Sequence, residues 1–179
     1  MGKTLILVDD NDNVLGYASK EECHTGDGKR HRAFAILIFN KEKKVLLQKR
    51  KHKRWDNFWD ITGASDICSV NGKHETYEEG GNRCLLDEWN FSSSLEKLFG
   101  YTYFERYDGM CENEYCALLI GEHNGGVEHN PDVAYGYKWV SLEELIENVE
   151  NTPQIYTPWA IIAINKLKNH SFAKTVLGV

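Results

Sequence analysis

Segment Ala33–Asn40 (AFAILIFN) is nearly all apolar and has no regular alternation of apolar and polar residues. A strand of this kind is buried on both faces, so the segment is predicted to be the central strand of a sheet. Other runs rich in apolar residues, several of them bounded by turn residues, predict further strands. These runs are Thr4–Asp9, Val14–Ser19, Val45–Lys51, Trp59–Ala64, Leu95–Arg106, Asn113–Gly121 and Tyr135–Val140.

Three helices are predicted from the residues that would cap their N-termini. The first follows Thr76, where Thr76 and Glu79 have the spacing of a capping box. The pair Gly80-Gly81 weakens this acidic helix, so packing against the rest of the fold must hold it. The other two helices begin at Ser141, running to about Asn148, and at Thr157, running through Lys168.

Strands outnumber helices in this pattern, and the helices fall between the strands or after them. That order indicates an α+β fold, a layered α/β/α sandwich in which helices flank a mixed β-sheet. Segment Glu21–His31 is polar and contains glycine, so it is predicted to be a loop. With 179 residues, the chain is most simply one domain (1–179), with a core from about 4 to 168 and a C-terminal tail from 169 to 179.

Composition and charge exclude several classes of protein. A net charge of -6 argues against general nucleic-acid binding. No apolar run approaches the roughly 18–20 residues of a membrane span, and the one near the N-terminus is too short for a signal peptide. The five cysteines form no CxxC pair and leave an odd count, which favours reduced thiols. We therefore expect a cytoplasmic protein, monomeric or homodimeric, with no nucleic-acid or membrane partner.

Glu112 and Glu114 are the most informative polar pair. Alternate residues of a strand face the same side, so both carboxylates project together. Two like charges on one face repel unless a cation or a shared proton compensates. His24 and His31, in the segment before the central strand, could add imidazole ligands to the same ion. The alternative is an exposed strand face with two ordinary surface or hydrogen-bonding histidines.

The basic run Lys49–Arg54 and the acidic pair Asp87-Glu88 suggest a phosphorylated ligand. Arginine and lysine can clamp phosphate oxygens, and paired carboxylates can hold a divalent ion that binds a diphosphate. The alternatives are a solvated hairpin tip and a solvated helix face. Trp159 could line an apolar pocket, although a tryptophan at this position is more often part of the core.

Segment 74–91 (HETYEEGGNRCLLDEWNF) resembles the Nudix box, whose usual form is G, five residues, E, seven residues, then RE-U-x-EE-x-G-U with U apolar. The first glutamate, the arginine, the acidic pair and the final apolar position are taken by Glu75, Arg83, Asp87, Glu88 and Phe91. The first glycine, the second glutamate and the second glycine are replaced by Ser69, Cys84 and Asn90.

Residues from about 4 to 168 are similar to the branch of the Nudix superfamily that contains type 1 isopentenyl-diphosphate isomerase. The similar stretches are HTGDGKRHRAF (24–34), LLQKRK (46–51), ENEYC (112–116) and TPQIYTPW (152–159). The resemblance implies a divalent metal held by three histidines and two glutamates, at positions that here carry His24, His31, Asp66, Glu112 and Glu114. Aspartate replaces the third histidine, and it can still bind a hard cation, so we expect Mg²⁺ or Mn²⁺.

The resemblance also assigns the remaining candidate residues. Metal ions at the box would be held by Glu75, Asp87 and Glu88. The diphosphate would lie near Lys20, Arg50, Lys51 and Lys53, and Trp159 would line the pocket. The candidate catalytic residues are Glu114, which is the expected base, with Glu88 and Tyr103.

Ala64 argues against isomerase chemistry. Moving a carbon–carbon double bond needs an acid and a base on opposite faces of the alkene, and the family uses a cysteine and a glutamate. Glu114 matches the glutamate, but Ala64 stands where the cysteine is expected, and alanine cannot transfer a proton. Cys68 lies four residues later, within an apparent insertion at 67–73, and a shifted alignment could bring it to that position.

The leading hypothesis is therefore a metal-dependent Nudix hydrolase acting on a small organic or nucleoside diphosphate. Cys84 weakens it, because a metal ligand of the usual box is absent. One alternative is isopentenyl-diphosphate isomerase, which Ala64 opposes. The other is a Nudix-fold binding module that has lost activity.

Overall fold

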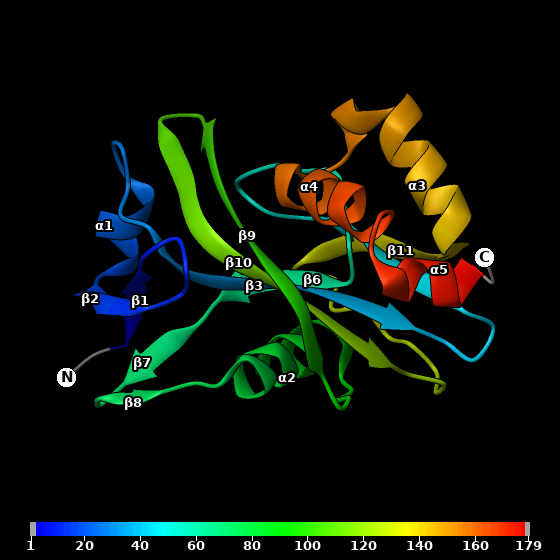
Figure 1. Ribbon diagram of the computed structural model, residues 1–179, viewed down its shortest axis with the longest axis horizontal. Coiled ribbons are helices and arrows are strands. Elements are labelled where there is room, and N and C mark those ends of the chain that lie inside the picture. The colour runs from blue at the N-terminus through cyan, green and yellow to red at the C-terminus, as the bar shows by residue number, and fades with distance from the viewer. Residues whose placement is uncertain (1–2, 178–179) are drawn as a thin grey trace.

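The computed structural model describes residues 3–177 as a mixed β-sheet between helices (Figure 1). Its strands are β1 Thr4–Val8, β2 Val14–Ala18, β3 His31–Phe39, β4 Lys44–Arg50, β5 Trp59–Asp60, β6 Gly63–Asp66, β7 Cys68–Val70, β8 Lys73–His74, β9 Glu96–Tyr107, β10 Met110–Glu122 and β11 Ala134–Ser141. Its helices are α1 Lys20–His24, α2 Tyr77–Trp89, α3 Leu142–Asn151, the 3-10 turn η1 Pro153–Ile155, α4 Pro158–Leu167 and α5 Ser171–Leu177. The predicted α+β class is confirmed.

Strand β3 lies at the centre of the sheet, as its apolar sequence predicts. It runs parallel to β10, from the pair His31–Glu114 to the pair Phe39–Glu122. On the other edge of β3, Phe39 pairs with Val45 of β4. Residues 33–36, nearer the start of β3, pair on that edge with β6. Strand β4 pairs instead with β11 and β5, so β4 and β6 diverge from each other. This divergence opens the sheet where the cavity described below is found.

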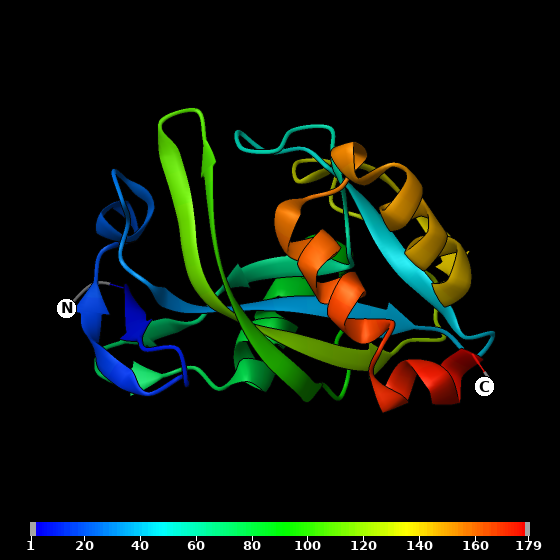
Figure 2. The same cartoon turned by 45° about the horizontal axis from the view of Figure 1, so that its top comes forward.

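The two faces of β3 belong to two hydrophobic clusters. Ala35 and Leu37 pack with residues of α3 and α4, which cover one face of the sheet (Figures 1 and 2). Phe34 and Ile36 pack with Leu85 of α2, which covers the other face. Burial on both faces explains why β3 lacks alternating polar residues.

Helix α2 begins with the predicted capping box. The Thr76 hydroxyl accepts from the Glu79 amide, and the Glu79 carboxylate accepts from the Thr76 amide. The glycine pair lets the helix approach the sheet closely: a Cβ on Gly80 would lie 2.6 Å from a methyl of Ile67, and one on Gly81 would overlap a methyl of Leu95.

None of the helices described between residues 3 and 177 combines the length and the apolar character of a membrane span.

The segment 21–31 differs from its prediction as a loop, because it includes the last part of α1. This helix has only five residues, too few to give a periodic pattern. It is stabilised by a second capping box, in which Ser19 and Glu22 exchange hydrogen bonds. Its last residue, His24, is buried and is thereby fixed in position.

Two other segments also contain more regular structure than the sequence indicates. The apparent insertion at 67–73 forms β7 and the start of β8, which pair with each other, while β7 also pairs with β1. The predicted C-terminal tail contains α5, in which Ala173 is buried in the core and Phe172 packs against Phe39 with ring centroids 5.6 Å apart. Residues 178–179 lie outside the described part of the chain.

Candidate active site

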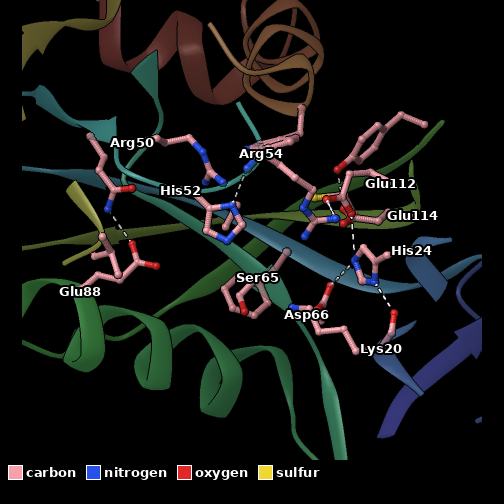
Figure 3. Close-up of a pocket in the computed structure, with 17 residues that line it drawn as sticks. Lys20, His24, Arg50, His52, Arg54, Ser65, Asp66, Glu88, Glu112 and Glu114 are labelled. Carbon is pink, nitrogen blue, oxygen red and sulfur yellow. Dashed lines mark hydrogen bonds and ion pairs between the residues drawn. The ribbon is translucent and has the colours of Figure 1, made fainter. Parts of the chain in front are cut away.

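Four side chains from three elements converge at one end of β3. His24 ends α1, His31 begins β3, and Glu112 and Glu114 project from the same face of β10. All four are buried, and one nitrogen or oxygen atom from each lies within 4.8 Å of the others. Three of them, His24, Glu112 and Glu114, are labelled in Figure 3. The parallel pairing of His31 with Glu114 brings the two strands into this register. Strand alternation therefore places the two glutamates together, as the sequence predicts.

The hydrogen bonds of the two histidines fit a divalent cation. The Nδ1 atom of His24 lies 2.7 Å from the Lys20 carbonyl, and Nδ1 of His31 lies 2.9 Å from the Lys29 carbonyl. A backbone carbonyl accepts a hydrogen bond from Nδ1–H, which leaves the Nε2 lone pair available for a metal. His24 Nε2 and Glu112 Oε2 are buried and lie 3.0 Å apart, and apart from that contact neither atom has a hydrogen-bond partner among the described residues. These four residues thus offer two imidazole nitrogens and two carboxylates, a set of donors that could hold a divalent cation.

The cluster carries negative charge that the protein only partly compensates. Burial, followed by the charges of Glu112 and Asp66, raises the pKa of Glu114 well above its usual range. The Tyr103 hydroxyl donates to Glu114 Oε2 at 2.7 Å, which opposes that rise. Burial also acts to raise the pKa of Glu112, but the hydrogen bond from His24 and the charge of Arg54 hold it below its usual value. A divalent cation would relieve the repulsion between the carboxylates.

Asp66 lies beside the cluster, in β6. Its Oδ1 atom is 3.2 Å from His31 Nε2 and 3.8 Å from His24 Nε2, while Oδ2 lies 2.9 Å from the Lys20 ammonium. Burial alone would raise the pKa of Asp66, but His31, Lys20 and His24 together hold it far below its usual range. Asp66 is therefore close enough to both imidazoles to remain the predicted fifth ligand.

A cavity of about 270 Å³ opens beside the cluster, between the diverging strands β4 and β6. Lys20, Arg50, His52 and Arg54 supply basic groups, and Glu88 reaches it from α2 (Figure 3). The remaining lining residues are His24, Phe34, Gln48, Ala64, Ser65, Asp66, Tyr103, Glu112, Glu114, Cys116, Val133 and Trp159. The cavity thus joins cationic groups, a potential metal site and an aromatic wall.

The structure separates the three acidic residues predicted at the box. Glu88 lines the cavity and accepts from Gln48 Nε2 at 2.7 Å. Glu75 forms an ion pair with Arg83 at 2.7 Å, away from the cavity lining. Asp87 is exposed on the outer side of α2. Of these three, Glu88 alone reaches the cavity.

The predicted basic residues divide in the same way. Arg50 and Lys20 line the cavity. Lys51 is exposed and donates to the Pro131 carbonyl at 2.8 Å. Lys53 is exposed and is not among the lining residues of the described chain. Arg50 is the last residue of β4, whereas Lys51 begins the loop that follows.

Several lining residues were not singled out from the sequence, and Arg54 is the most notable. Its Nη1 atom lies 2.6 Å from Glu112 Oε1. The next residue, Trp55, packs against Tyr107 of β9 with ring centroids 4.8 Å apart, which docks the β4–β5 loop on the β9–β10 hairpin. The basic run indicated this loop, but not that His52 and Arg54 turn inward. Gln48 and Cys116 lie in stretches that are similar to the family but were given no role, and Ser65 gave no sequence signal.

Ala64 lines the cavity from β6, and β6 itself (GASD) contains no cysteine. Cys68 is buried in β7 in a small cluster with Leu5 and Cys23, outside the cavity lining of the described residues. The position of Cys68 therefore does not support the shifted alignment, in which Cys68 would replace the family's cysteine.

Glu88 gives a prediction about stability and pH. Burial raises its pKa from 4.5 to about 7. The folded protein therefore holds this proton more tightly than the unfolded chain, and stability is lost as the pH rises from about 4.5 to about 7. That rise in pKa corresponds to as much as about 3 kcal/mol. In metal-free protein, Glu88→Gln should therefore be more stable than wild type at pH 8 and similar to it at pH 4.5, as measured by urea unfolding.

The control for this prediction is Asp87→Asn, which changes the exposed neighbouring carboxylate on the same helix. It should leave the difference in unfolding free energy between the two pH values as in wild type. Parallel pH dependence of wild type and Glu88→Gln would contradict the burial of the Glu88 charge.

Comparison with known proteins identifies relatives over most of the chain. The model of the NUDIX domain family matches residues 29–160. Isopentenyl-diphosphate Delta-isomerase 2 of Aromatoleum aromaticum is 31% identical over 93% of this chain and 87% of its own length. Isopentenyl-diphosphate Delta-isomerase of Haloarcula marismortui is 35% identical over 90% of this chain and 89% of its own length.

Solved structures show the same fold at lower identity. DR0079 from Deinococcus radiodurans superposes with a TM-score of 0.71 at 18% identity, covering 91% of this chain and 98% of that one. The MutT protein from Methanosarcina mazei Go1 superposes with a TM-score of 0.59 at 17% identity, covering 77% of this chain and 94% of that one.

Proposed function

Because this chain belongs to the Nudix family, in the branch that contains proteins named isopentenyl-diphosphate Delta-isomerase, we propose that it is a metal-dependent hydrolase of a small organic or nucleoside diphosphate. The observation that carries the proposal is the composition of the cavity. Basic side chains, a His/carboxylate cluster and the partly buried Glu88 face one space of about 270 Å³. Cationic groups, a metal site and a base are groups that an enzyme can use to hydrolyse a diphosphate.

His24, His31, Glu112 and Glu114 would hold a divalent ion, Mg²⁺ or Mn²⁺, with Asp66 beside them. Such an ion supplies charge neutralisation for the diphosphate and polarises its phosphorus–oxygen bonds. In the usual Nudix box, several carboxylates of the box hold the metal ions. Cys84 replaces one of these carboxylates here, so the His/carboxylate cluster would hold the metal instead.

The chain's own residues provide the remaining steps. Arg50, Lys20 and Arg54 would bind diphosphate oxygens from the basic side of the cavity. Glu88, whose pKa burial raises to about 7, is suited to accept a proton from the attacking water at neutral pH. Water then forms the new bond to phosphorus, and the bridging phosphorus–oxygen bond breaks. In this scheme Glu88 is the base, and Glu114, the base expected from the sequence, is a metal ligand.

The second candidate is isomerisation of isopentenyl diphosphate. It is favoured by relatives of that name, which align with 90% or more of this chain, and by the contact between Tyr103 and Glu114. It is opposed by the arrangement around β3. Tyr103 and Glu114 lie on the β9–β10 side of that strand, and Ala64 lies on the β6 side. A methyl group there leaves the second face of an alkene without a proton donor or acceptor.

The experiment that separates the two reactions is product analysis with a panel of diphosphates. Hydrolysis releases orthophosphate or a monophosphate, whereas isomerisation returns a rearranged diphosphate.

Arg50 gives a prediction about substrate binding. Arg50→Met should raise KM for a diphosphate by about 10- to 100-fold, the loss expected for a hydrogen bond to a charged group. The effect on kcat should be smaller if Arg50 binds substrate and transition state equally. Steady-state kinetics of the variant measure both quantities.

Lys51→Met is the matched control, because Lys51 is the next residue, is exposed and donates to the Pro131 carbonyl. It should change KM by less than about twofold, as a surface charge would. Equal increases in KM for both variants would show that the basic run acts through its general charge and not through Arg50.

A further inference from the structure

Asp60 is a fully buried acid that lies behind the cavity and not in it. It belongs to β5, has 0% of its surface exposed and is not a lining residue. Two residues that do line the cavity, Arg50 and Trp159, both contact its carboxylate. Asp60 therefore connects two parts of the cavity wall that are more than 100 residues apart in sequence.

The carboxylate of Asp60 accepts from every polar group that reaches it. Oδ1 accepts from the Ile61 amide at 2.8 Å and from the Thr157 hydroxyl at 2.9 Å. The Trp159 indole N–H donates to both oxygens, at 2.9 and 3.0 Å, and Arg50 Nη1 donates to Oδ2 at 3.1 Å. Because all of these partners are donors, the ionised carboxylate is the form that satisfies them. Burial raises the pKa of Asp60 above its usual value, while Arg50, Thr157 and Trp159 limit that rise.

Arg50 and Trp159 also contact each other. The Arg50 guanidinium lies over the Trp159 ring, with Cζ 5.0 Å from the ring centroid. Arg50 Nε is buried and has no hydrogen-bond partner among the described residues, so Asp60 does not use all of its donors. A cation held by one carboxylate and by one aromatic face has little freedom to rotate.

The backbone around Asp60 explains how one residue reaches both elements. Asp60 pairs with Gln48 in β4, two residues before Arg50. The preceding residue, Trp59, accepts a hydrogen bond at its carbonyl from the Thr157 amide, at the start of α4. Thr157 does not use its side chain to cap α4; it gives its hydroxyl to Asp60 instead. Asp60 thus lies at the junction of β4, β5 and the N-terminus of α4.

We propose that Asp60 is a positioning residue that fixes the Arg50 guanidinium and the Trp159 indole as one unit facing the diphosphate. The inference rests on the proposed function, since it assigns Arg50 to the diphosphate. It extends that function by naming the group that sets the geometry of this cation.

The test is binding of inorganic pyrophosphate, measured by isothermal titration calorimetry in buffer with Mg²⁺. Wild type, Asp60→Asn, Arg50→Met and the double variant are compared. Asp60→Asn should weaken binding by about tenfold or more, because the amide group of asparagine cannot accept from all four donors and Arg50 loses its anchor. In the Arg50→Met background the same change should have less than about twofold effect, because Asp60 acts through Arg50.

Two results would overturn the inference while leaving the proposed function in place. Asp60→Asn could bind pyrophosphate more tightly than wild type, which would mean that Asp60 only neutralises Arg50. The losses from the two single variants could also multiply in the double variant, which is the behaviour of a merely structural residue. Absence of pyrophosphate binding by wild type would overturn both proposals. Binding that depends on Asp60 in a protein that hydrolyses no diphosphate would refute the hydrolase alone.

Thr157→Val provides a second variant if Asp60→Asn does not fold. Thr157 is buried, lies outside the cavity lining and donates its hydroxyl to Asp60. Its replacement removes one of the donors that orient the carboxylate and leaves the charge in place. We expect a loss of about threefold or more in pyrophosphate affinity, the smaller effect of a neutral hydrogen bond. Unchanged affinity in a folded Thr157→Val protein would count against a positioning role.

Discussion

Glu114→Gln is expected to weaken metal binding and to abolish activity. Glutamine keeps the size of the side chain and can still accept from the Tyr103 hydroxyl, but it removes a negative charge from the cluster. Glu114 lies with His24, His31 and Glu112 inside a 4.8 Å group of ligand atoms, so the loss of its charge weakens the hold of the whole group on a cation. The measurements are calorimetric titration with Mn²⁺ and turnover of a diphosphate substrate.

The controls for this prediction come from the same hairpin. Glu105 is an exposed carboxylate on β9, paired across the strands with Glu112, and Glu105→Gln should change neither metal affinity nor turnover. Glu112→Gln should weaken metal binding in the same way as Glu114→Gln. Unchanged metal affinity in both Glu112→Gln and Glu114→Gln would remove the basis for a metal site at this end of β3.

Ala64→Cys is expected to separate the two candidate reactions. The unmodified protein should convert isopentenyl diphosphate very slowly or not at all, because a positioned acid–base group contributes about 10²- to 10⁴-fold and Ala64 supplies none. If the rest of the cavity can bind an alkene diphosphate, with Glu114, Tyr103 and Trp159 on its other walls, the new thiol should create detectable isomerisation. If the cavity binds a different diphosphate, Ala64→Cys should have no effect on isopentenyl diphosphate.

Cys68→Ala is the control for that experiment. Cys68 lies in β7, outside the cavity lining, so its replacement should leave all activities unchanged. Strong isomerisation by the unmodified protein that survives Cys68→Ala would show that the reaction does not need a thiol at position 64. Loss of that activity in Cys68→Ala would instead show that β6 and β7 move to bring Cys68 into the cavity.

The parts of the site that follow a strict period could be predicted from the sequence. Strand alternation placed Glu112 and Glu114 on one face, and the capping pattern of Thr76 and Glu79 located the start of α2. Helix periodicity also predicts that Asp87 and Glu88, which were assigned to one metal site, face different directions. Adjacent positions on a helix point about 100° apart, so Asp87 and Glu88 cannot both face the cavity from a straight helix.

Other parts of the site depend on tertiary contacts that leave no local pattern. Arg54 reaches Glu112, and the next residue, Trp55, packs on Tyr107. Both contacts form only when the β4–β5 loop is folded against the β9–β10 hairpin. Asp60 is one acid in a short strand, and its importance comes from donors on β4 and α4. His24 could be proposed as a ligand from its place before the central strand, whereas the short α1 that fixes it could not be predicted, because five residues carry too little periodicity.

The most direct test of the proposed hydrolase is turnover by the purified protein, with Mg²⁺ and with Mn²⁺, of a panel of small organic and nucleoside diphosphates that includes isopentenyl diphosphate. Products are identified by phosphate release and by mass and proton NMR spectra of the organic part. We predict metal-dependent release of orthophosphate or a monophosphate from at least one member of the panel, abolished in Glu114→Gln, with no conversion of isopentenyl to dimethylallyl diphosphate. Metal-dependent formation of dimethylallyl diphosphate, or tight binding of a diphosphate without turnover of any panel member, would contradict it.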